Sequence, residues 1–111
     1  EALRDIGFSH SALESAVQLA KISVAAGARA IVCSPLEVQA IRAAVGPTPT
    51  IITPGVRPAG SALGDQTRVM TPADAIAAGS TYLVIGRPIT SLESSELMLD
   101  KAREISDSIT Q

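Results

Sequence analysis

Two pairs of a glycine and an arginine in this sequence have the chemistry of an anion site. Gly55 and Arg57 follow an apolar run at 50–53, and Gly86 and Arg87 follow a second one at 82–85. Glycine lets backbone N–H groups approach an anion, and the guanidinium group of arginine offers a phosphate a rigid fork of donors. Each residue alone could be a turn glycine or a surface charge. Together, at two consecutive strand ends, they predict a phosphate site.

A long segment, 55–70, separates the first pair from the next predicted helix. Its glycines and prolines alternate with polar side chains, among them Arg57 and Gln66. Connections in α/β proteins usually take about 2–6 residues, and much longer ones are mostly functional or disordered. One interpretation is a closing loop that places Arg57 and Gln66 on a ligand, and the other is a solvated insertion. The position beside strand ends favours the closing loop.

The other reactive side chains do not form a convincing catalytic group. His10 suits a polar helix entry, and Cys33 has no His partner and resembles a small buried hydrophobic residue. Asp65 could act as a general base, but in a glycine-rich loop such a residue more often orders the turn. The two lysines, Lys21 and Lys101, fall within predicted helices. No group of His, Cys and carboxylates has the spacing of metal ligands. The sequence therefore predicts ligand-binding residues but no catalytic residue and no metal site.

Apolar spacing predicts the elements that position the glycines and arginines. Helical stripes occur at 13–24, 38–45 and 98–109, a capped short helix runs from 72 to 78, and buried strands are expected at 30–33, 50–53 and 82–85. The order αβαβαβα predicts a parallel sheet with flanking helices. A helix that ends on glycine before a strand occurs twice, at Gly27 and Gly79, as in (β/α) barrels and in doubly wound sheets. A complete (β/α)₈ barrel has eight strands and about 250 residues, so if the fold is a barrel, this chain forms less than half of one.

Composition excludes several broad classes of protein. The chain of 111 residues is 46% hydrophobic and 2% aromatic, which suits strands buried on both faces. A formal net charge of −2 argues against general binding to nucleic acid or to an anionic membrane. No apolar run approaches the ~18 residues of a membrane span. A single cysteine cannot form an internal disulfide, so we expect a cytoplasmic protein.

Four motifs stand out in the segment 53–90: Thr-Pro-Gly-Val-Arg-Pro at 53–58, Gly-Asp-Gln at 64–66, Met-Thr-Pro at 70–72 and Ile-Gly-Arg-Pro-Ile-Thr at 85–90. With these motifs the segment resembles bacterial orotidine 5′-phosphate decarboxylase. The similarity extends more weakly over nearly the whole chain. The resemblance implies that residues 1–111 form the C-terminal portion of a single (β/α)₈ domain, whose N-terminal half is absent.

The same resemblance implies specific roles. Arg57 and Gln66 would contact the nucleotide, while the Gly86 backbone and the Arg87 guanidinium would bind its 5′-phosphate. The family converts orotidine 5′-phosphate to UMP and CO₂ in pyrimidine biosynthesis, as a cytoplasmic homodimer without metal or organic cofactor. Its chemistry depends on an Asp-x-Lys-x-x-Asp segment in the N-terminal half, which this sequence lacks. We therefore expect the isolated chain to be inactive.

Two alternatives stay open. The chain could belong to another phosphate-binding barrel, such as a sugar-phosphate decarboxylase or epimerase, although Gly60-Ser61 and the Gly-Asp-Gln segment disfavour this. It could also be a non-catalytic half-barrel that associates with itself or a partner, because three strands leave unpaired edges and apolar surface.

Overall fold

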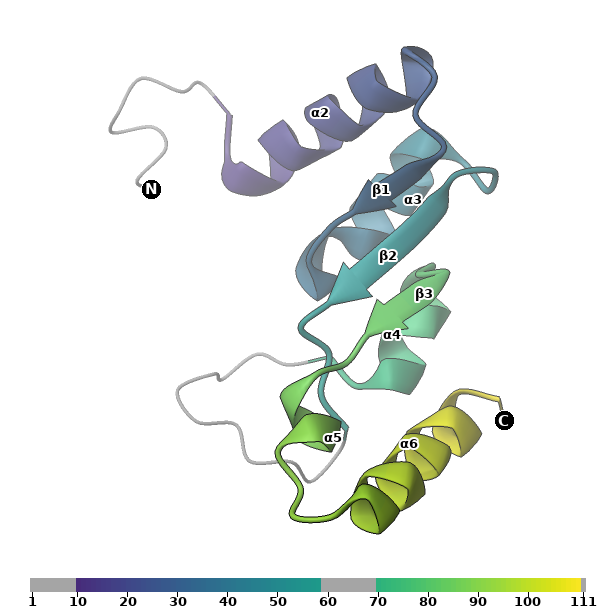
Figure 1. Ribbon diagram of the computed structural model, residues 1–111. Helices are drawn as coiled ribbons and strands as arrows, with labels where there is room; N and C mark the ends of the chain where they lie inside the picture. Colours follow the sequence, from purple (N-terminus) through teal and green to yellow (C-terminus); the bar gives the residue numbers. More distant parts are fainter. Residues whose placement is uncertain (1–9, 59–69, 111) are drawn as a thin grey trace.

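A three-stranded parallel sheet organises the chain. The computed structural model describes residues 10–58 and 70–110, and its strands lie in the order β1-β2-β3 (Figure 1). The strands are β1 (Ala30–Val32), β2 (Thr50–Pro54) and β3 (Tyr82–Val84). The helices are α2 (Ala12–Ala25), the 3₁₀ helix η1 (Pro35–Glu37), α3 (Val38–Val45), α4 (Pro72–Ala78), α5 (Arg87–Thr90) and α6 (Ser95–Ile109). The predicted alternation of helices and parallel strands is confirmed, and η1 and the single-turn α5 are additions to it.

The helices pack against one face of the sheet only. In Figure 1, α3 and α4 lie behind the strands, with α2 and α6 at the two ends of the layer. The core lies between α2, α3 and the sheet and includes Ala20, Val38, Ile41 and Ile51. The helical spacing at 38–45 predicts an inner face of Val38, Ile41 and Val45, of which Val38 and Ile41 are buried and Val45 is partly buried. Among the described residues, no helix combines the length and the apolar character needed to cross a membrane.

The prediction that the outer strands are buried is wrong. Val32 in β1 is 68% exposed, and Tyr82 and Val84 in β3 are 64% and 53% exposed. Successive side chains of a strand point to opposite faces, and none of the described residues covers the face away from the helices. The apolar residues of a strand indicate that its side chains favour burial. They do not show whether another element is present to cover them.

Arg42 joins the amino ends of β2 and β3, a role that no sequence pattern predicts. From α3, its Nε and Nη2 donate to the carbonyl oxygen of Gly79 at 3.0 and 2.8 Å. Its Nη1 donates to the carbonyl oxygens of Pro49 at 2.6 Å and Gly46 at 3.0 Å, and Nη2 also donates to Thr81 Oγ1 at 3.1 Å. Both strands are therefore fixed at one end, which helps to set where their carboxyl ends lie.

Candidate functional site

The carboxyl ends of β2 and β3 share a pocket of about 280 Å³. Because these strands are parallel neighbours, with Pro54 aligned to Val84, the loops that follow them leave the same edge of the sheet. The lining residues are Pro54, Gly55, Val56, Arg57, Val84, Gly86, Arg87 and Pro88. Three of the four binding residues that the sequence predicts, Arg57, Gly86 and Arg87, therefore line one pocket.

The β2 side of the pocket is held by a buried anchor and a backbone hydrogen bond. Gly55 has φ +83°, a conformation that glycine adopts without the strain that other residues incur. Val56 is only 2% exposed, and the N–H of Arg57 donates to the carbonyl oxygen of Met70 at 3.1 Å. This bond fixes the backbone of Arg57, from which the half-buried side chain extends.

The β3 side is a sharp turn into α5. The carbonyl oxygen of Gly86 accepts hydrogen bonds from the N–H groups of Ile89 and Thr90, both at 2.9 Å. Pro88 suits the first turn of a helix because its ring fixes a helical φ and a donor is not needed there. The first N–H groups of a helix have no acceptor within it, and that of Arg87 is one of them. The turn therefore presents a backbone donor together with an exposed guanidinium.

The described lining of this pocket carries positive charge but no group suited to proton transfer. Two guanidinium groups line it, without a carboxylate, imidazole, thiol or amine. Elsewhere, Lys101 pairs with Glu104 on α6 at 3.0 Å, and His10 lies 3.4 Å from Glu14 at the start of α2. The arrangement can bind and orient an anion. Gln66, the fourth predicted binding residue, lies outside the described residues, so its role stays a prediction.

A second pocket of about 520 Å³ adjoins the first at the carboxyl ends of β1 and β2. The two pockets share Pro54 and Gly55, and the second is also lined by Cys33, Ser34 and Glu37. Burial, and secondarily the Glu37 carboxylate, raises the pKa of the Cys33 thiol, so this group stays protonated near neutral pH. The position of Ser34, close after β1, is the sequence signal that could have marked it as a pocket residue.

Comparison with known proteins agrees with this geometry. A model of the orotidine 5′-phosphate decarboxylase / HUMPS family matches residues 1–101. The chain belongs to the orotidine 5′-phosphate decarboxylase family. An orotidine 5′-phosphate decarboxylase from Trichlorobacter lovleyi is 48% identical over 105 residues, which cover 91% of this chain and 44% of that protein. Another, from Thermobifida fusca, is 58% identical over 89 residues, which cover 80% of this chain and 38% of that protein.

Solved structures show the same fold. The orotidine 5′-phosphate decarboxylase of Lactobacillus acidophilus is 30% identical, with a TM-score of 0.75 over 96% of this chain and 42% of that one. An uncharacterized conserved protein from Geobacillus kaustophilus, 22% identical, has a TM-score of 0.73 and supports the fold alone. The chain spans about two fifths of the length of these curated orotidine 5′-phosphate decarboxylases. The family resemblance and the expectation of less than half a barrel are confirmed.

Proposed function

We propose that this chain is the C-terminal, phosphate-binding portion of an orotidine 5′-phosphate decarboxylase, the carboxy-lyase that forms UMP and CO₂ in pyrimidine biosynthesis. The observation that carries the proposal is the shared pocket of Arg57, Gly86 and Arg87 in a chain of this family. The complete protein would be a cytoplasmic homodimer that needs no cofactor. Orotidine 5′-phosphate and UMP would be its ligands.

The roles follow from the chemistry of each side chain. The guanidinium of Arg87 and the backbone N–H groups at Gly86 would bind the 5′-phosphate, since both donate to phosphate oxygens. Arg57 on the opposite wall, together with Gln66, would contact the rest of the nucleotide. The adjoining pocket of about 520 Å³ offers room for the part of the ligand beyond the phosphate. Binding energy from a non-reacting phosphate can then hold the reacting carbon in position.

Decarboxylation itself requires residues from outside this sequence. The family motif Asp-x-Lys-x-x-Asp does not occur in the chain, and of its two lysines Lys101 is paired on α6 and Lys21 lies on α2. We therefore propose that the chain alone is inactive. Its contribution to catalysis would be the energy with which it binds the phosphate end of the substrate.

A comparison of UMP with uridine tests the phosphate assignment. Arg87→Ala should weaken UMP binding by roughly 1.5–3 kcal/mol, about ten- to a hundred-fold, the scale of a charged hydrogen bond. Isothermal titration calorimetry would measure both ligands, and uridine binding should not change. Arg103→Ala, which removes an exposed arginine on α6, is the matched control. Equal UMP affinity in the Arg87→Ala and unsubstituted chains would refute the assignment.

A competition experiment between UMP and a pentulose phosphate distinguishes the sugar-phosphate alternative from the proposed function. A sugar-phosphate decarboxylase or epimerase would bind a pentulose phosphate at least as well as UMP. The curated relatives from Trichlorobacter lovleyi and Thermobifida fusca both have the orotidine 5′-phosphate decarboxylase name, which favours the nucleotide. Displacement of UMP by a pentulose phosphate at equal concentration would reverse this preference.

A further inference from the structure

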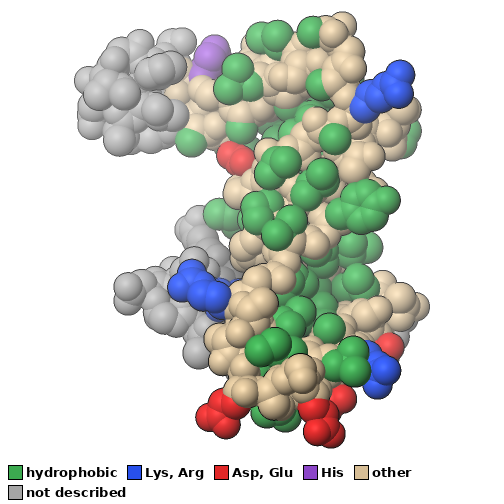
Figure 2. Space-filling model, in the orientation of Figure 1, with side chains coloured by type: hydrophobic (Ala, Val, Ile, Leu, Met, Phe, Trp, Pro, Cys, Tyr) green, Lys and Arg blue, Asp and Glu red, His purple; other side chains and the backbone are tan. Residues whose placement is uncertain are grey.

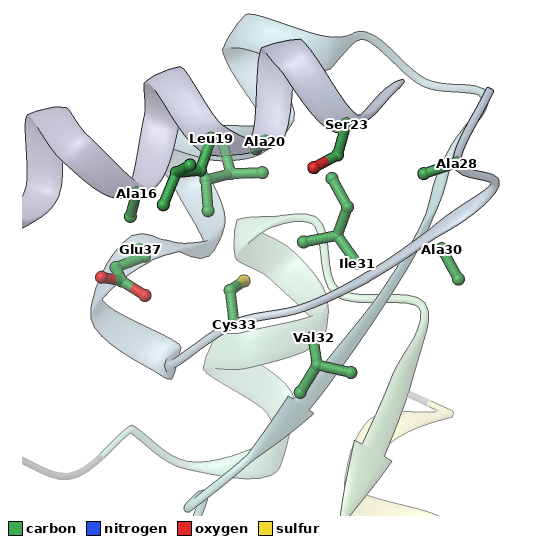
Figure 3. A pocket seen from close by; sticks show the side chains of 11 residues that line it. Ala16, Leu19, Ala20, Ser23, Ala28, Ala30, Ile31, Val32, Cys33 and Glu37 are labelled. Carbon is green, nitrogen blue, oxygen red and sulfur yellow. The ribbon is translucent and has the colours of Figure 1, made fainter. Parts of the chain in front are cut away.

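Two hydroxyl groups contact each other in the interior of the molecule, close to the candidate phosphate pocket. Thr53 on β2 is fully buried, and Ser80, at the turn from α4 into β3, is 6% exposed. Among the described residues they are the only buried polar side chains, and their oxygens lie 2.7 Å apart. By contrast, the groove of about 410 Å³ between α2 and β1 is lined mainly by apolar side chains such as Leu19 and Ile31 (Figure 3). Because burial of a hydroxyl group costs free energy unless it is hydrogen-bonded, the pair needs a physical reason.

The direction of the hydrogen bonds in this pair follows from the number of protons. Ser80 Oγ lies 3.0 Å from the carbonyl oxygen of Tyr82 and 3.3 Å from that of Ile51, and a carbonyl oxygen can only accept. The single hydroxyl proton of Ser80 is donated to these carbonyls, so the Thr53 hydroxyl is the donor to Ser80 Oγ. A chain of hydrogen bonds therefore runs from the Thr53 side chain on β2, through Ser80, to the backbone of the two strands.

The hydroxyl pair joins the elements that carry the two pocket arginines. Thr53 lies near the end of β2, shortly before Arg57, and Ser80 leads into β3, which is followed by Arg87. Both arginines line the pocket at the carboxyl ends of these strands. Ser80 also fixes β3 to α4, because its N–H donates to the carbonyl oxygen of Ala75 at 3.0 Å. The position of one arginine relative to the other therefore depends on how β2 and β3 are held together at this pair.

The other contacts between β2 and β3 specify their alignment only weakly. β3 has three residues, and Pro54, at the end of β2, has no N–H to donate to a neighbouring strand. Figure 2 shows hydrophobic side chains along the middle of the sheet, and contacts of this kind are non-directional. A shift of the pairing by two residues would keep the same side chains on each face and displace the strand ends by about 7 Å. The hydroxyl pair would be broken by such a shift, so it favours the observed register.

We propose that Thr53 and Ser80 are positioning residues of the phosphate site. Their hydrogen bond sets the register of β2 against β3 and, through it, the distance between the Arg57 and Arg87 sides of the pocket. A nucleotide that spans both sides gains from its phosphate only when this distance is right, because its two ends cannot move independently. If only a fraction of the molecules has the binding geometry, the apparent affinity falls by that fraction. The inference rests on the proposed function, since it requires that the pocket binds a 5′-phosphate.

The preference of the full 111-residue chain for UMP over uridine tests the positioning role. Thr53→Val nearly keeps the shape of the side chain and removes the hydroxyl group. Calorimetry should show that the preference falls about three- to ten-fold while uridine affinity is unchanged, since uridine has no phosphate to misplace. Thr53→Ser keeps the hydroxyl group and should retain the preference. An unchanged preference in Thr53→Val would overturn this inference and leave the proposed function intact, whereas an unsubstituted chain with no preference for UMP would refute both.

Two further variants separate positioning from a general loss of stability. Ile41→Val removes a methyl group from the core between α2, α3 and the sheet, so it should lower the urea midpoint but leave the preference for UMP unchanged. Ser80→Ala breaks the same hydrogen bond from its other side, and the double variant with Thr53→Val should weaken the preference no more than the stronger single change. Circular dichroism checks that each variant is folded. Equal loss of preference in Ile41→Val and Thr53→Val would overturn the positioning role.

Discussion

Arg42 and Arg87 show two uses of the same side chain. All three guanidinium nitrogens of Arg42 donate to oxygens around the amino ends of β2 and β3. Arg87 is exposed at the opposite, carboxyl end of the sheet, on the wall of the candidate phosphate pocket. Arg42 therefore stabilises the scaffold, whereas Arg87 is available to a ligand. Sequence position alone marked only Arg87, because it follows a predicted strand.

Arg42→Lys should reduce stability although it keeps the charge. A lysine ammonium cannot reach the carbonyl oxygens of Gly79 and Pro49 with the same planar fork. Loss of these charged hydrogen bonds should lower the free energy of unfolding by about 2–3 kcal/mol, measured by urea denaturation. Arg103→Lys on the exposed surface of α6 is the control and should change it little. Equal stability of the two variants would show that the Arg42 bonds contribute nothing measurable.

Cys33 should make stability depend on pH in the alkaline range. Burial raises the thiol pKa above its ordinary value of 9.0, so the unfolded chain releases this proton at a lower pH than the folded one. The contribution is fully present below the unfolded pKa and is lost as pH rises through the folded pKa. Thermal unfolding between neutral pH and pH values above 9.0 should therefore show a steeper loss for the unsubstituted chain than for Cys33→Ala. If the stability of the two chains falls in parallel as the pH rises, the predicted contribution of Cys33 is contradicted.

Connections between elements decide how closely the helices approach the sheet. Gly79 ends α4 with φ +121°, and a Cβ at this position would lie 2.9 Å from Cγ of Arg42. Gly27 follows α2 with φ +110°, yet a Cβ there would have open space around it. Both glycines satisfy the same backbone requirement after a helix. Only Gly79 is also needed for a close contact between α3 and the turn into β3.

Substitution of these two glycines separates the two effects. Gly27→Ala should cost about 1 kcal/mol, from the backbone conformation alone. Gly79→Ala carries the same backbone cost and also pushes the Arg42 stem away from its acceptors, so the loss should be about 1–3 kcal/mol greater. Thermal or urea unfolding of both variants measures the difference. A Gly79→Ala chain as stable as Gly27→Ala would show that the contact relaxes freely.

At the scale of the whole molecule, the chain has an incompletely covered sheet. One face packs against helices around Ile51, which is fully buried, while the opposite face exposes Val32, Tyr82 and Val84. Such a surface favours association because it removes apolar area from water. This property explains how one chain can have a well-packed core and still lack the shape of a closed domain.

The isolated chain should therefore associate with itself weakly as its concentration rises. Sedimentation equilibrium should show an average mass that increases with concentration, and Val32→Asp should suppress the increase because a carboxylate resists burial. Leu97→Asp should not suppress it. A strictly monomeric chain with a sharp thermal transition at all concentrations would contradict this expectation and weaken the half-barrel alternative.

The sequence by itself determined the order of elements, most helix ends, the glycine–arginine pairs and the family. These are local properties: the spacing at 38–45 specifies a helical face, and Thr71 caps α4 by accepting from the N–H of Asp74. Only the tertiary structure decided that Arg57 and Arg87 line one pocket, that Arg42 holds two strands, and that β1 and β3 expose a face. Those outcomes depend on pairing between residues about thirty positions apart, such as Ile52 with Tyr82, and on which neighbours are present. Local sequence patterns predict the secondary structure and burial that each residue favours. Long-range packing determines which residues are buried and which side chains lie together.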